Sequence, residues 1–297
     1  MAKRYIKLPG FLALIFLMGW SMSWGQTSTQ NFGTTTVSHT SSTGSTTFIP
    51  APTTSGTTWA RAGVGGSVNL VTASNPLSTT GAYVRAVASS TGAVNKFSPW
   101  VGYTGGTEFY TSFKVMFGDS SGGSTATSGV WKFYQGAGAM YSDAADFTGA
   151  QVFTGLTFTY GTGGALALTY RAAATNSTAG LTQTSFASGT VYTIEIVGNN
   201  KTSGTINYSY AGNAQTVAVQ KFDLYVNGTL IGNDLAEAAL PANTNINSGT
   251  FIGISSVGNV ANVFVDNAVT YNAVPASIGV ATPTISSTGT PISVSTN

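Results

Sequence analysis

The sequence predicts an all-β protein folded as an antiparallel β-sandwich, and three observations support this fold class. Short segments in which apolar and polar residues alternate recur about every ten residues, with glycines in the turns between them. Residues 221–232, KFDLYVNGTLIG, contain Asn227-Gly228, the pair that favours a tight type I′ hairpin turn. No segment keeps a helical period, and the best candidate, 233–241, predicts about two turns of helix that end at Pro241.

The strongest strand signal lies in residues 107–119, TEFYTSFKVMFGD, where side chains alternate between two faces. The odd positions predict a core face and the even positions an outer face: Phe109, Thr111, Phe113, Val115 and Phe117 against Tyr110, Ser112, Lys114 and Met116. In 129–136, Trp131 and Phe133 share a face, which predicts that both lie in the core. Further strands are expected at 82–89, 155–161, 164–172, 190–198 and 204–212, the last two as a hairpin around 199–203.

The composition divides the chain into four parts. Residues 1–25 start with three basic residues, continue with a short apolar run and end with small residues, as a secretory signal peptide does. Residues 26–58 are rich in Ser and Thr and join the sandwich through a short strand expected near Asn31-Phe32; residues 59–275 hold the sandwich, and 276–297 have the composition of a linker. The product is expected to be secreted or at the cell surface, without a membrane span in the mature chain.

Charge and cysteine content exclude several classes of function. Removal of residues 1–25 leaves eight basic residues against nine acidic ones without a basic cluster, which argues against nucleic acid as a partner. The chain has no cysteine, so thiolate metal sites and cysteine catalysis are excluded. His39 is the one histidine, in a Ser/Thr-rich segment typical of an exposed loop, which also excludes a zinc site built from several histidines.

Two stretches near the end of the chain carry a resemblance to a known kind of domain. Residues 221–232, followed by FIGISSVGNVANVFVDNAVTYN at 251–272, resemble the closing strands of concanavalin A-like, laminin-G-like β-sandwich domains. More loosely, the run from Trp59 to Tyr271 is similar to uncharacterised secreted domains of Bacteroidota that often precede a sorting domain for type IX secretion; this sequence shows no such sorting domain. The resemblance implies a lectin-type jelly roll, without defined catalytic residues.

Glycoside hydrolysis is the obvious enzyme class on such a fold, and it needs two carboxyl groups on either side of the glycosidic bond. None of the nine acidic residues forms an i, i+2 pair on a predicted strand, so no strand presents two carboxylates on one face. The sequence therefore favours a non-catalytic protein. A polysaccharide-active glycoside hydrolase stays as the alternative, because acids distant in sequence can still converge in space.

Aromatic residues are the candidates for binding a sugar, because rings stack on the apolar faces of pyranoses, and those in loops are less easily explained as core. Trp100 and Tyr103 lie in a loop-like stretch, SPWVGYTGG, and Tyr141 follows a glycine-rich loop. Trp59 and Tyr134 complete the set of candidate ligand-binding residues. Packing in the core is the alternative for these side chains.

A structural calcium ion is the one cofactor that the sequence supports. Calcium takes six to eight oxygen ligands, and the candidates are Asp119 in GDSSGG, Asp143 and Asp146 in SDAAD, and Asp266. Domains of the kind that the chain resembles often hold such an ion. Turn capping by Asp side chains is the alternative, and no EF-hand spacing is present.

These observations together predict a secreted or cell-surface, non-catalytic β-sandwich module that binds carbohydrate or serves adhesion. Its expected partners are glycans or other cell-surface proteins. A purely structural domain of a larger surface protein is the second alternative beside the hydrolase, because a low charge suits it equally well and a fold does not dictate a function.

Overall fold

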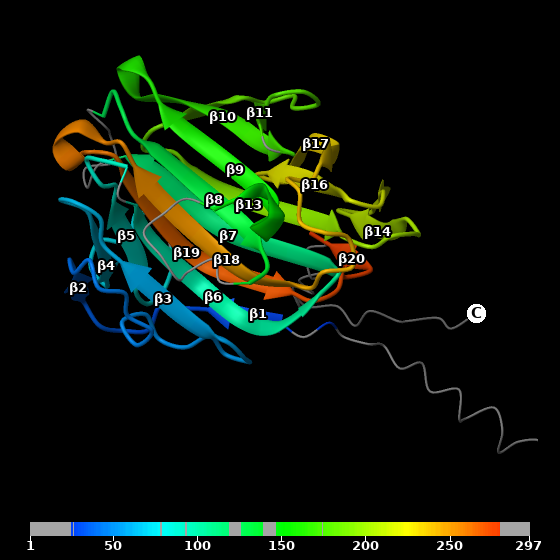
Figure 1. The fold of residues 1–297 in the computed structure, drawn as a ribbon, viewed down its shortest axis with the longest axis horizontal. Coiled ribbons are helices and arrows are strands. Elements are labelled where there is room, and N and C mark those ends of the chain that lie inside the picture. Colours follow the sequence, from blue (N-terminus) through cyan, green and yellow to red (C-terminus); the bar gives the residue numbers. More distant parts are fainter. Residues whose placement is uncertain are drawn as a thin grey trace, which may run out of the picture.

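The computed structural model describes residues 25, 27–77, 79–92, 94–118, 126–138, 147–173 and 175–279. Two large antiparallel sheets, A and B, face each other around the core, and a small sheet, C, lies on the outer side of sheet A. Figure 1 shows the long strands of both sheets crossing the molecule diagonally. The predicted all-β sandwich is therefore confirmed.

Sheet A has nine strands. In spatial order eight of them are β17 (Thr229–Ala236), β16 (Lys221–Val226), β13 (Val191–Asn199), β7 (Glu108–Gly118), β19 (Asn262–Tyr271), β5 (Tyr83–Val87), β4 (Ser67–Val71) and β2 (Val37–His39). The ninth, β1 (Thr27–Gln30), pairs with the far half of β19.

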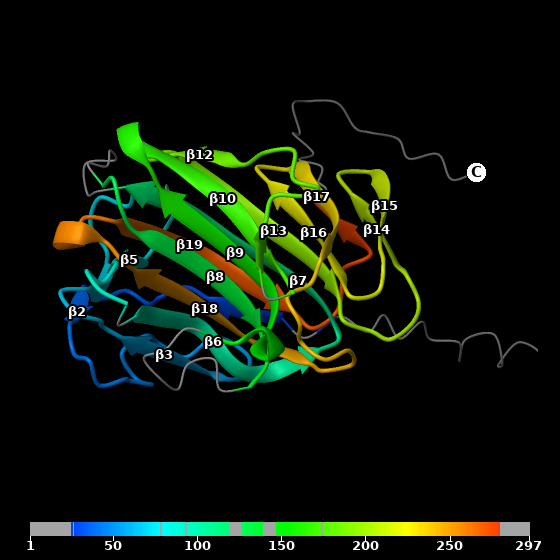
Figure 2. The ribbon, with the colours of Figure 1, turned by 45° about the horizontal axis from the view of Figure 1, so that its top comes forward.

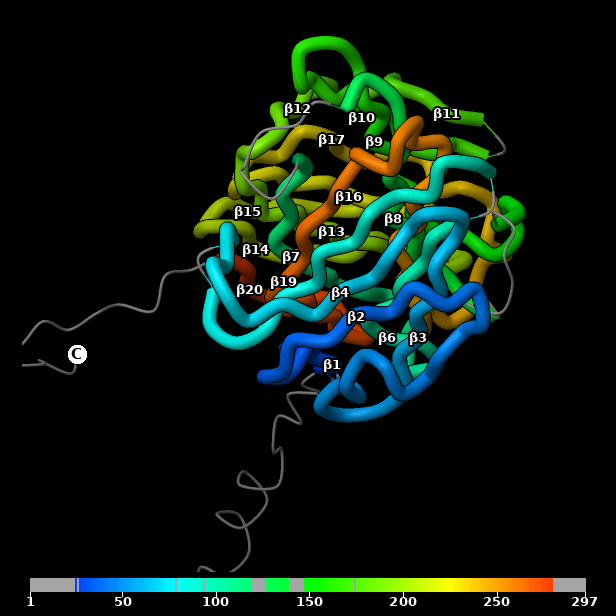
Figure 3. Tube along the Cα trace, turned by 90° about the vertical axis from the view of Figure 1, so that its left-hand side faces the viewer, coloured from blue at the N-terminus to red at the C-terminus, as the bar shows by residue number. Residues whose placement is uncertain are grey.

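Sheet B has eight strands. They follow the order β11 (Thr175–Ser177), β10 (Ala165–Ala172), β9 (Val152–Tyr160), β8 (Val130–Gly136), β18 (Ile246–Ile254), β6 (Asn95–Gly106) and β3 (Thr57–Arg61), and β12 (Ser185–Ala187) pairs with β10. The two sheets extend across the molecule in the same direction: β2, β4 and β3 lie at one side, and β17, β10 and β11 lie at the other (Figure 3).

Sheet C consists of β15 (Asn213–Val217), β14 (Ile206–Tyr210) and β20 (Ser277–Ile278). It lies at one end of the molecule, on the right in Figure 2, while the loop between β18 and β19 lies at the opposite end. Three short 3₁₀ turns complete the described elements: Gly149–Gln151, Thr162–Gly164 and Val257–Asn259. Within the described part of the chain, no helix has the length and apolar character needed to cross a membrane.

The core forms where the alternating residues of both sheets meet, as the sequence predicts. Phe113 from sheet A packs against Phe133 and Phe251 from sheet B, with ring centroids 4.7 and 5.2 Å apart. All five predicted core positions of 107–119 are buried, and so is Trp131. Aromatic side chains of this size bury about 150–250 Å² each, so they supply much of the driving force for closing the sandwich.

The hairpin at Asn227-Gly228 is confirmed. Both turn residues have positive φ, 48° and 79°, as a type I′ turn requires, and they join β16 to β17. The expected helix at 233–241 is wrong, because residues 233–236 continue β17. Leu235 is buried opposite Phe222 in that strand pair, so burial of its side chain outweighs the weak local helix preference.

Two other expectations differ from the structure. The segments 190–198 and 204–212 do not form a hairpin, because β13 pairs with β7 and β16 in sheet A while β14 belongs to sheet C. Sheet A also begins before residue 59, because β1 and β2 pair within it, while β20 beyond residue 275 belongs to sheet C. The predicted signal peptide falls on residues 1–24 and Gly25, of which only Gly25 is described.

Candidate ligand-binding site

The aromatic residues that the sequence singles out lie in the interior. Trp100 and Tyr103 belong to strand β6 instead of a loop, and both rings are buried. Trp100 lies against the backbone of Gly249, where an added Cβ would be 2.7 Å from its Nε1, so the glycine makes room for the indole. The Tyr103 hydroxyl contacts Thr270 at 3.2 Å inside the sandwich. These two rings therefore present no face for stacking on a sugar.

The other predicted aromatics have similar surroundings. Trp59 is covered by the segment around Gly44, whose added Cβ would overlap the indole. Tyr134 lies on the outer face of sheet B, yet it is buried beneath Arg171 and Phe147. Tyr141 lies outside the described residues. Strand pairing and neighbouring segments cover the four described residues, so for them the structure shows packing, the alternative that the sequence left open, and none offers an open ring to a sugar.

The calcium prediction divides in the same way. Asp119, Asp143 and Asp146 lie outside the described residues, so for them calcium binding stays a prediction. Asp266 is buried, and its carboxylate accepts hydrogen bonds from the Thr79 hydroxyl and from the backbone N–H of Asn267, the latter at 2.7 Å. These contacts fasten the loop before β5 to β19. Among the described residues no group of three or more His, Asp or Glu side chains is placed to hold a metal ion.

Exposed aromatic rings are rare in the described part of the chain. All but three of its Phe, Tyr and Trp side chains are buried; the three half-buried ones are Phe48, Tyr110 and Tyr271. Phe48 lies alone beside His39, with ring centroids 5.2 Å apart. Tyr110 and Tyr271, in contrast, are direct cross-strand partners on β7 and β19, with centroids 5.6 Å apart. The two tyrosines therefore form the one pair of Phe, Tyr or Trp rings among the described residues that is open to solvent.

This pair forms the floor of a pocket of about 660 Å³. Thr27 of β1 pairs with Tyr271, so three neighbouring strands contribute Thr27, Tyr271 and Tyr110 to one row on the outer face of sheet A. The wall is the segment from Ala273 to Gly279, which leads from β19 to β20 and lines the pocket with Val274 and Pro275. The pocket therefore combines two rings, apolar side chains and backbone polar groups.

A buried carboxylate stands behind Tyr110. Glu195 of β13 lies on the same outer face of sheet A and is 7% exposed. The Tyr110 hydroxyl donates to Oε1 of Glu195 at 2.6 Å, and the Tyr210 hydroxyl donates to Oε2. Burial and the Glu195 carboxylate both raise the pKa of Tyr110 above its usual value, so the phenol stays a proton donor. Glu195 therefore fixes the orientation of the pocket tyrosine.

The polar network continues away from the pocket beneath sheet C. The rings of Tyr210 and Tyr225 are stacked with centroids 3.9 Å apart, and the hydroxyls of Tyr208 and Tyr225 are 2.8 Å apart. Tyr208 also donates to Oδ2 of Asp223 at 2.6 Å. Burial raises the pKa of Asp223 to about 6. Sheet C is thus joined to sheet A through tyrosine hydroxyls on two buried carboxylates.

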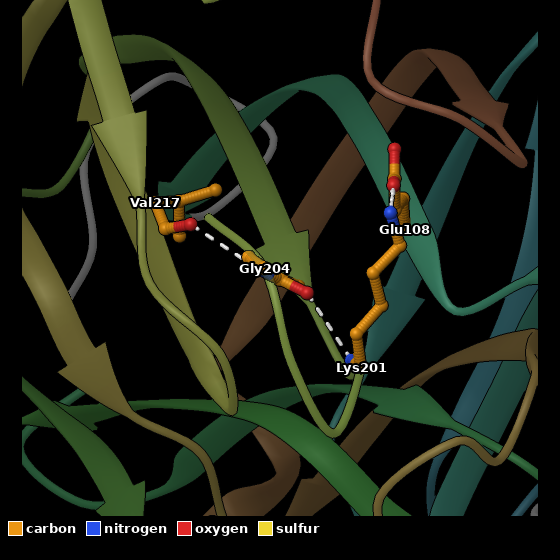
Figure 4. A network of polar contacts seen from close by, with 5 residues as sticks. Glu108, Lys201, Gly204 and Val217 are labelled. Carbon is orange, nitrogen blue, oxygen red and sulfur yellow. Dashed lines mark hydrogen bonds and ion pairs between the residues drawn. The ribbon is translucent and has the colours of Figure 1, made fainter. Parts of the chain in front are cut away.

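A second set of contacts fixes the connection from β13 to sheet C. Fully buried Asn199 donates from Nδ2 to the carbonyl oxygens of Gly204 and Val217, at 3.0 and 3.2 Å. Figure 4 shows this region together with the ion pair between Lys201 and Glu108. Glu108 precedes Tyr110 by two residues on β7 and therefore lies on the same face of the strand. Its negative charge is balanced by the ion pair with Lys201.

The arrangement suits binding better than hydrolysis. Glu195 and Asp223 lie on neighbouring strands and the same face, a convergence that the search for pairs within one strand misses. Both are covered, and their oxygens accept hydrogen bonds from tyrosines, so neither faces an open cleft that holds a substrate. The open chemistry of the site is ring stacking by Tyr110 and Tyr271.

The sequence contains part of the signal for this site. The alternation in 107–119 correctly predicts that Tyr110 lies on the outer face. Tyr271 belongs to the stretch 251–272 that resembles the closing strands of lectin-type sandwiches. What the sequence lacks is the register of β7 against β19, two strands separated by about half of the chain, which makes the two tyrosines neighbours.

Known proteins are similar to this chain in their structure and not in their sequence. No family model and no curated protein sequence matches the chain. Among solved structures, the chain is similar to alginate lyase Aly36B, at 15% identity over 65% of this chain and 82% of that chain, with a TM-score of 0.40.

Two further solved structures are similar to the chain. The carbohydrate recognition domain of Emp47p is 10% identical over 86% of this chain and 100% of that chain, with a TM-score of 0.42. The binding domain of botulinum neurotoxin DC in complex with SialylT is 11% identical over 84% of this chain and 48% of that chain, with a TM-score of 0.43. At these identities the similarity concerns the β-sandwich fold alone.

Proposed function

We propose that this protein is a non-catalytic carbohydrate-binding module of the cell exterior, and that its ligand binds on the Tyr110–Tyr271 pair. The observation that carries the proposal is the exposure pattern of the aromatic rings. Nearly all are buried in the described chain, whereas these two lie side by side in a pocket. Aromatic rings in a concave site with a few fixed polar groups are the usual means of holding a sugar.

The surroundings of the pair support stacking. Val274 and Pro275 offer apolar contacts, and the hydroxyl and carbonyl groups of the 273–279 wall offer hydrogen bonds to sugar hydroxyls. The Tyr110 ring is held by its hydrogen bond to Glu195, so little side-chain entropy is lost when a ligand packs on it. A rigid platform of this kind favours binding of an extended glycan chain.

The test is a binding measurement on the mature chain, with soluble neutral polysaccharides in affinity electrophoresis followed by calorimetry with the best oligosaccharide. Tyr271→Ala is expected to weaken binding about ten-fold or more, because a loss of about 1.4 kcal/mol of contact energy is a factor of ten. Phe48→Ala is the matched control, since it removes the other half-buried ring, away from the pocket. Equal affinity of both variants and the wild type would show that the pocket does not bind the glycan.

The location is proposed on the sequence alone. Residues 1–25 have the pattern of a signal peptide, with cleavage before Gln26. Mass spectrometry of the N-terminus of protein recovered after export tests this. A chain that retains Met1 and remains in the cytoplasm contradicts it.

A further inference from the structure

We propose that the tyrosine pocket prefers uncharged glycans to acidic ones and that Glu195 sets this preference. The inference rests on the proposed function, because it concerns the ligand class of the same pocket. It follows from the charges around the pocket, and it distinguishes neutral hexose polymers from uronates with the same linkage.

The described lining of the pocket contains no positive charge. Its residues are Gly25, Thr27, Tyr110, Tyr271, Ala273, Val274, Pro275, Ala276, Ser277, Ile278 and Gly279. Recognition of a carboxylate usually employs an arginine or lysine in a charge-assisted hydrogen bond. Hydroxyl, carbonyl and ring groups suit sugar hydroxyls instead.

An acidic side chain is hydrogen-bonded directly to Tyr110. Glu195 accepts a hydrogen bond from the Tyr110 hydroxyl at 2.6 Å, so its carboxylate lies directly behind the pocket floor. The Glu195 side chain makes its hydrogen bonds to two tyrosine hydroxyls, which leave the charge in place. Glu108 on the same strand forms an ion pair with Lys201, so that pair adds little net charge. Glu195 is therefore the charge that a ligand on Tyr110 encounters.

The size of the effect follows from Coulomb's law. A ligand carboxylate over the Tyr110 ring would lie about 8 Å from Glu195, and with a dielectric between those of the protein surface and water the repulsion weakens binding about five-fold. Each further uronate in reach adds to this factor. Such a preference is electrostatic, so it decreases with added salt.

The experiment compares matched oligosaccharides on the intact mature chain. Manno-oligosaccharides and cello-oligosaccharides are each titrated beside their uronic acid counterparts of equal length, at about 20 mM and about 500 mM salt, which changes the screening length several-fold. The wild type is expected to bind the neutral member about five-fold more tightly at low salt. In Glu195→Gln, which keeps the shape of the side chain, this difference is expected to vanish.

The double variant Glu108→Gln/Lys201→Gln is the control, because it removes both members of an ion pair beside Tyr110 on β7 and so leaves the net charge unchanged. It is expected to leave the preference for the neutral member in place. If Glu195→Gln does not fold, closure of the difference at high salt in the wild type is the remaining test. Uronates that bind as tightly as neutral glycans, through Tyr271, overturn the inference while preserving the proposed function. Absence of any Tyr271-dependent binding defeats the proposed function itself.

Discussion

Sheets A and B of the sandwich differ in the charge that they carry. The strands of sheet B contain four basic residues, Arg61, Lys96, Lys132 and Arg171, and no acidic one. The strands of sheet A contain five acidic residues, Glu108, Glu195, Asp223, Asp234 and Asp266, beside three basic ones, Arg85, Lys114 and Lys221. The two sheets share one core, but the charged side chains of sheet A are mostly acidic and those of sheet B are all basic.

The two sheets also accommodate their charges in different ways. The buried acids of sheet A accept hydrogen bonds from hydroxyl and N–H groups, as Glu195 and Asp223 do from tyrosines. In sheet B the basic groups lie over rings and donate to carbonyls: Lys96 lies 4.2 Å from the centre of the Phe147 ring, and Arg171 donates to the Phe147 carbonyl at 2.8 Å. The comparison teaches that buried acids make sheet A sensitive to pH, while shape and packing govern sheet B.

The largest expected effect is the pH dependence that Asp223 imposes on sheet A. An acid whose pKa is higher in the folded than in the unfolded state holds its proton more tightly when folded, so its stabilising contribution is greatest at low pH and is lost as the pH rises through the folded pKa. For Asp223 the window runs from 3.8 to about 6, and the loss amounts to about 3 kcal/mol. Urea unfolding of the wild type and Asp223→Asn between pH 4 and pH 7 measures it; parallel pH profiles would contradict it.

The next largest expected effect is the difference between losing a tyrosine hydrogen bond to a charged acceptor and losing one to a neutral acceptor. Tyr208→Phe removes the donor to the buried Asp223 carboxylate and is expected to lower the free energy of unfolding by about 2 kcal/mol at pH 7. Tyr160→Phe in sheet B removes a donor to the neutral carbonyl of Asn262, at 2.6 Å, and is expected to cost about 1 kcal/mol. A larger loss in Tyr160→Phe than in Tyr208→Phe contradicts the contrast between the sheets.

A smaller effect tests the packing on the outer face of sheet B. An added Cβ at Gly155 would lie 3.0 Å from both Arg171 Cβ and Tyr134 Cε1, so Gly155→Ala is expected to cost about 1 kcal/mol by displacing these side chains. At Gly161 the nearest atom would be 3.6 Å away, an ordinary contact. Thermal unfolding compares Gly155→Ala with Gly161→Ala, and equal shifts in melting temperature are evidence against a tight fit at Gly155.

The smallest effect concerns Arg171 itself. Its guanidinium lies 5.7 Å from the centre of the Tyr134 ring, in a half-exposed position where such contacts contribute about 0.5 kcal/mol. Arg171→Met keeps the apolar stem but removes this contact together with the hydrogen bond to the Phe147 carbonyl, so it is expected to lower the free energy of unfolding by up to about 1 kcal/mol. A change above about 2 kcal/mol, the upper range for desolvated pairs, disagrees with this assignment.

Local patterns predict the fold well because they act within a few residues. The alternation in 107–119 predicts the core face of β7, and Asn227-Gly228 predicts the hairpin of β16 and β17. The expected helix at 233–241 fails because Leu235 gains more from burial in the core than from local preference. Trp100 and Tyr103 are misplaced because a proline and glycines mark loops in general, whereas here long-range pairing of β6 with β18 extends the strand through them.

The candidate site is harder to predict because it depends on contacts between distant parts of the chain. Tyr110 and Tyr271 become partners only through strand register, and the wall from Ala273 to Gly279 reaches them through the pairing of β20 with the distant β14. The pair of acids, Glu195 and Asp223, also converges across neighbouring strands. Contacts between distant strands leave no local pattern in the sequence. A search of local sequence therefore selects aromatic residues such as Trp100 and Tyr103, which the structure buries in the core.

The start of β1 and the end of β19 lie side by side at the tyrosine pocket. Gly25 and Ala273 are adjacent, with an added Cβ on the glycine 2.9 Å from that of Ala273, so the entry into β1 and the exit from β19 meet in space. The loop before β19 lies at the far end of the molecule and carries Val257, whose side chain is 74% exposed. A circular permutant that keeps the chain up to Gly279, joins that end to Gly25 through a linker and opens the backbone at Val257 therefore retains every described strand, β20 included, and carries its fusion partners at the end of the molecule remote from the tyrosines.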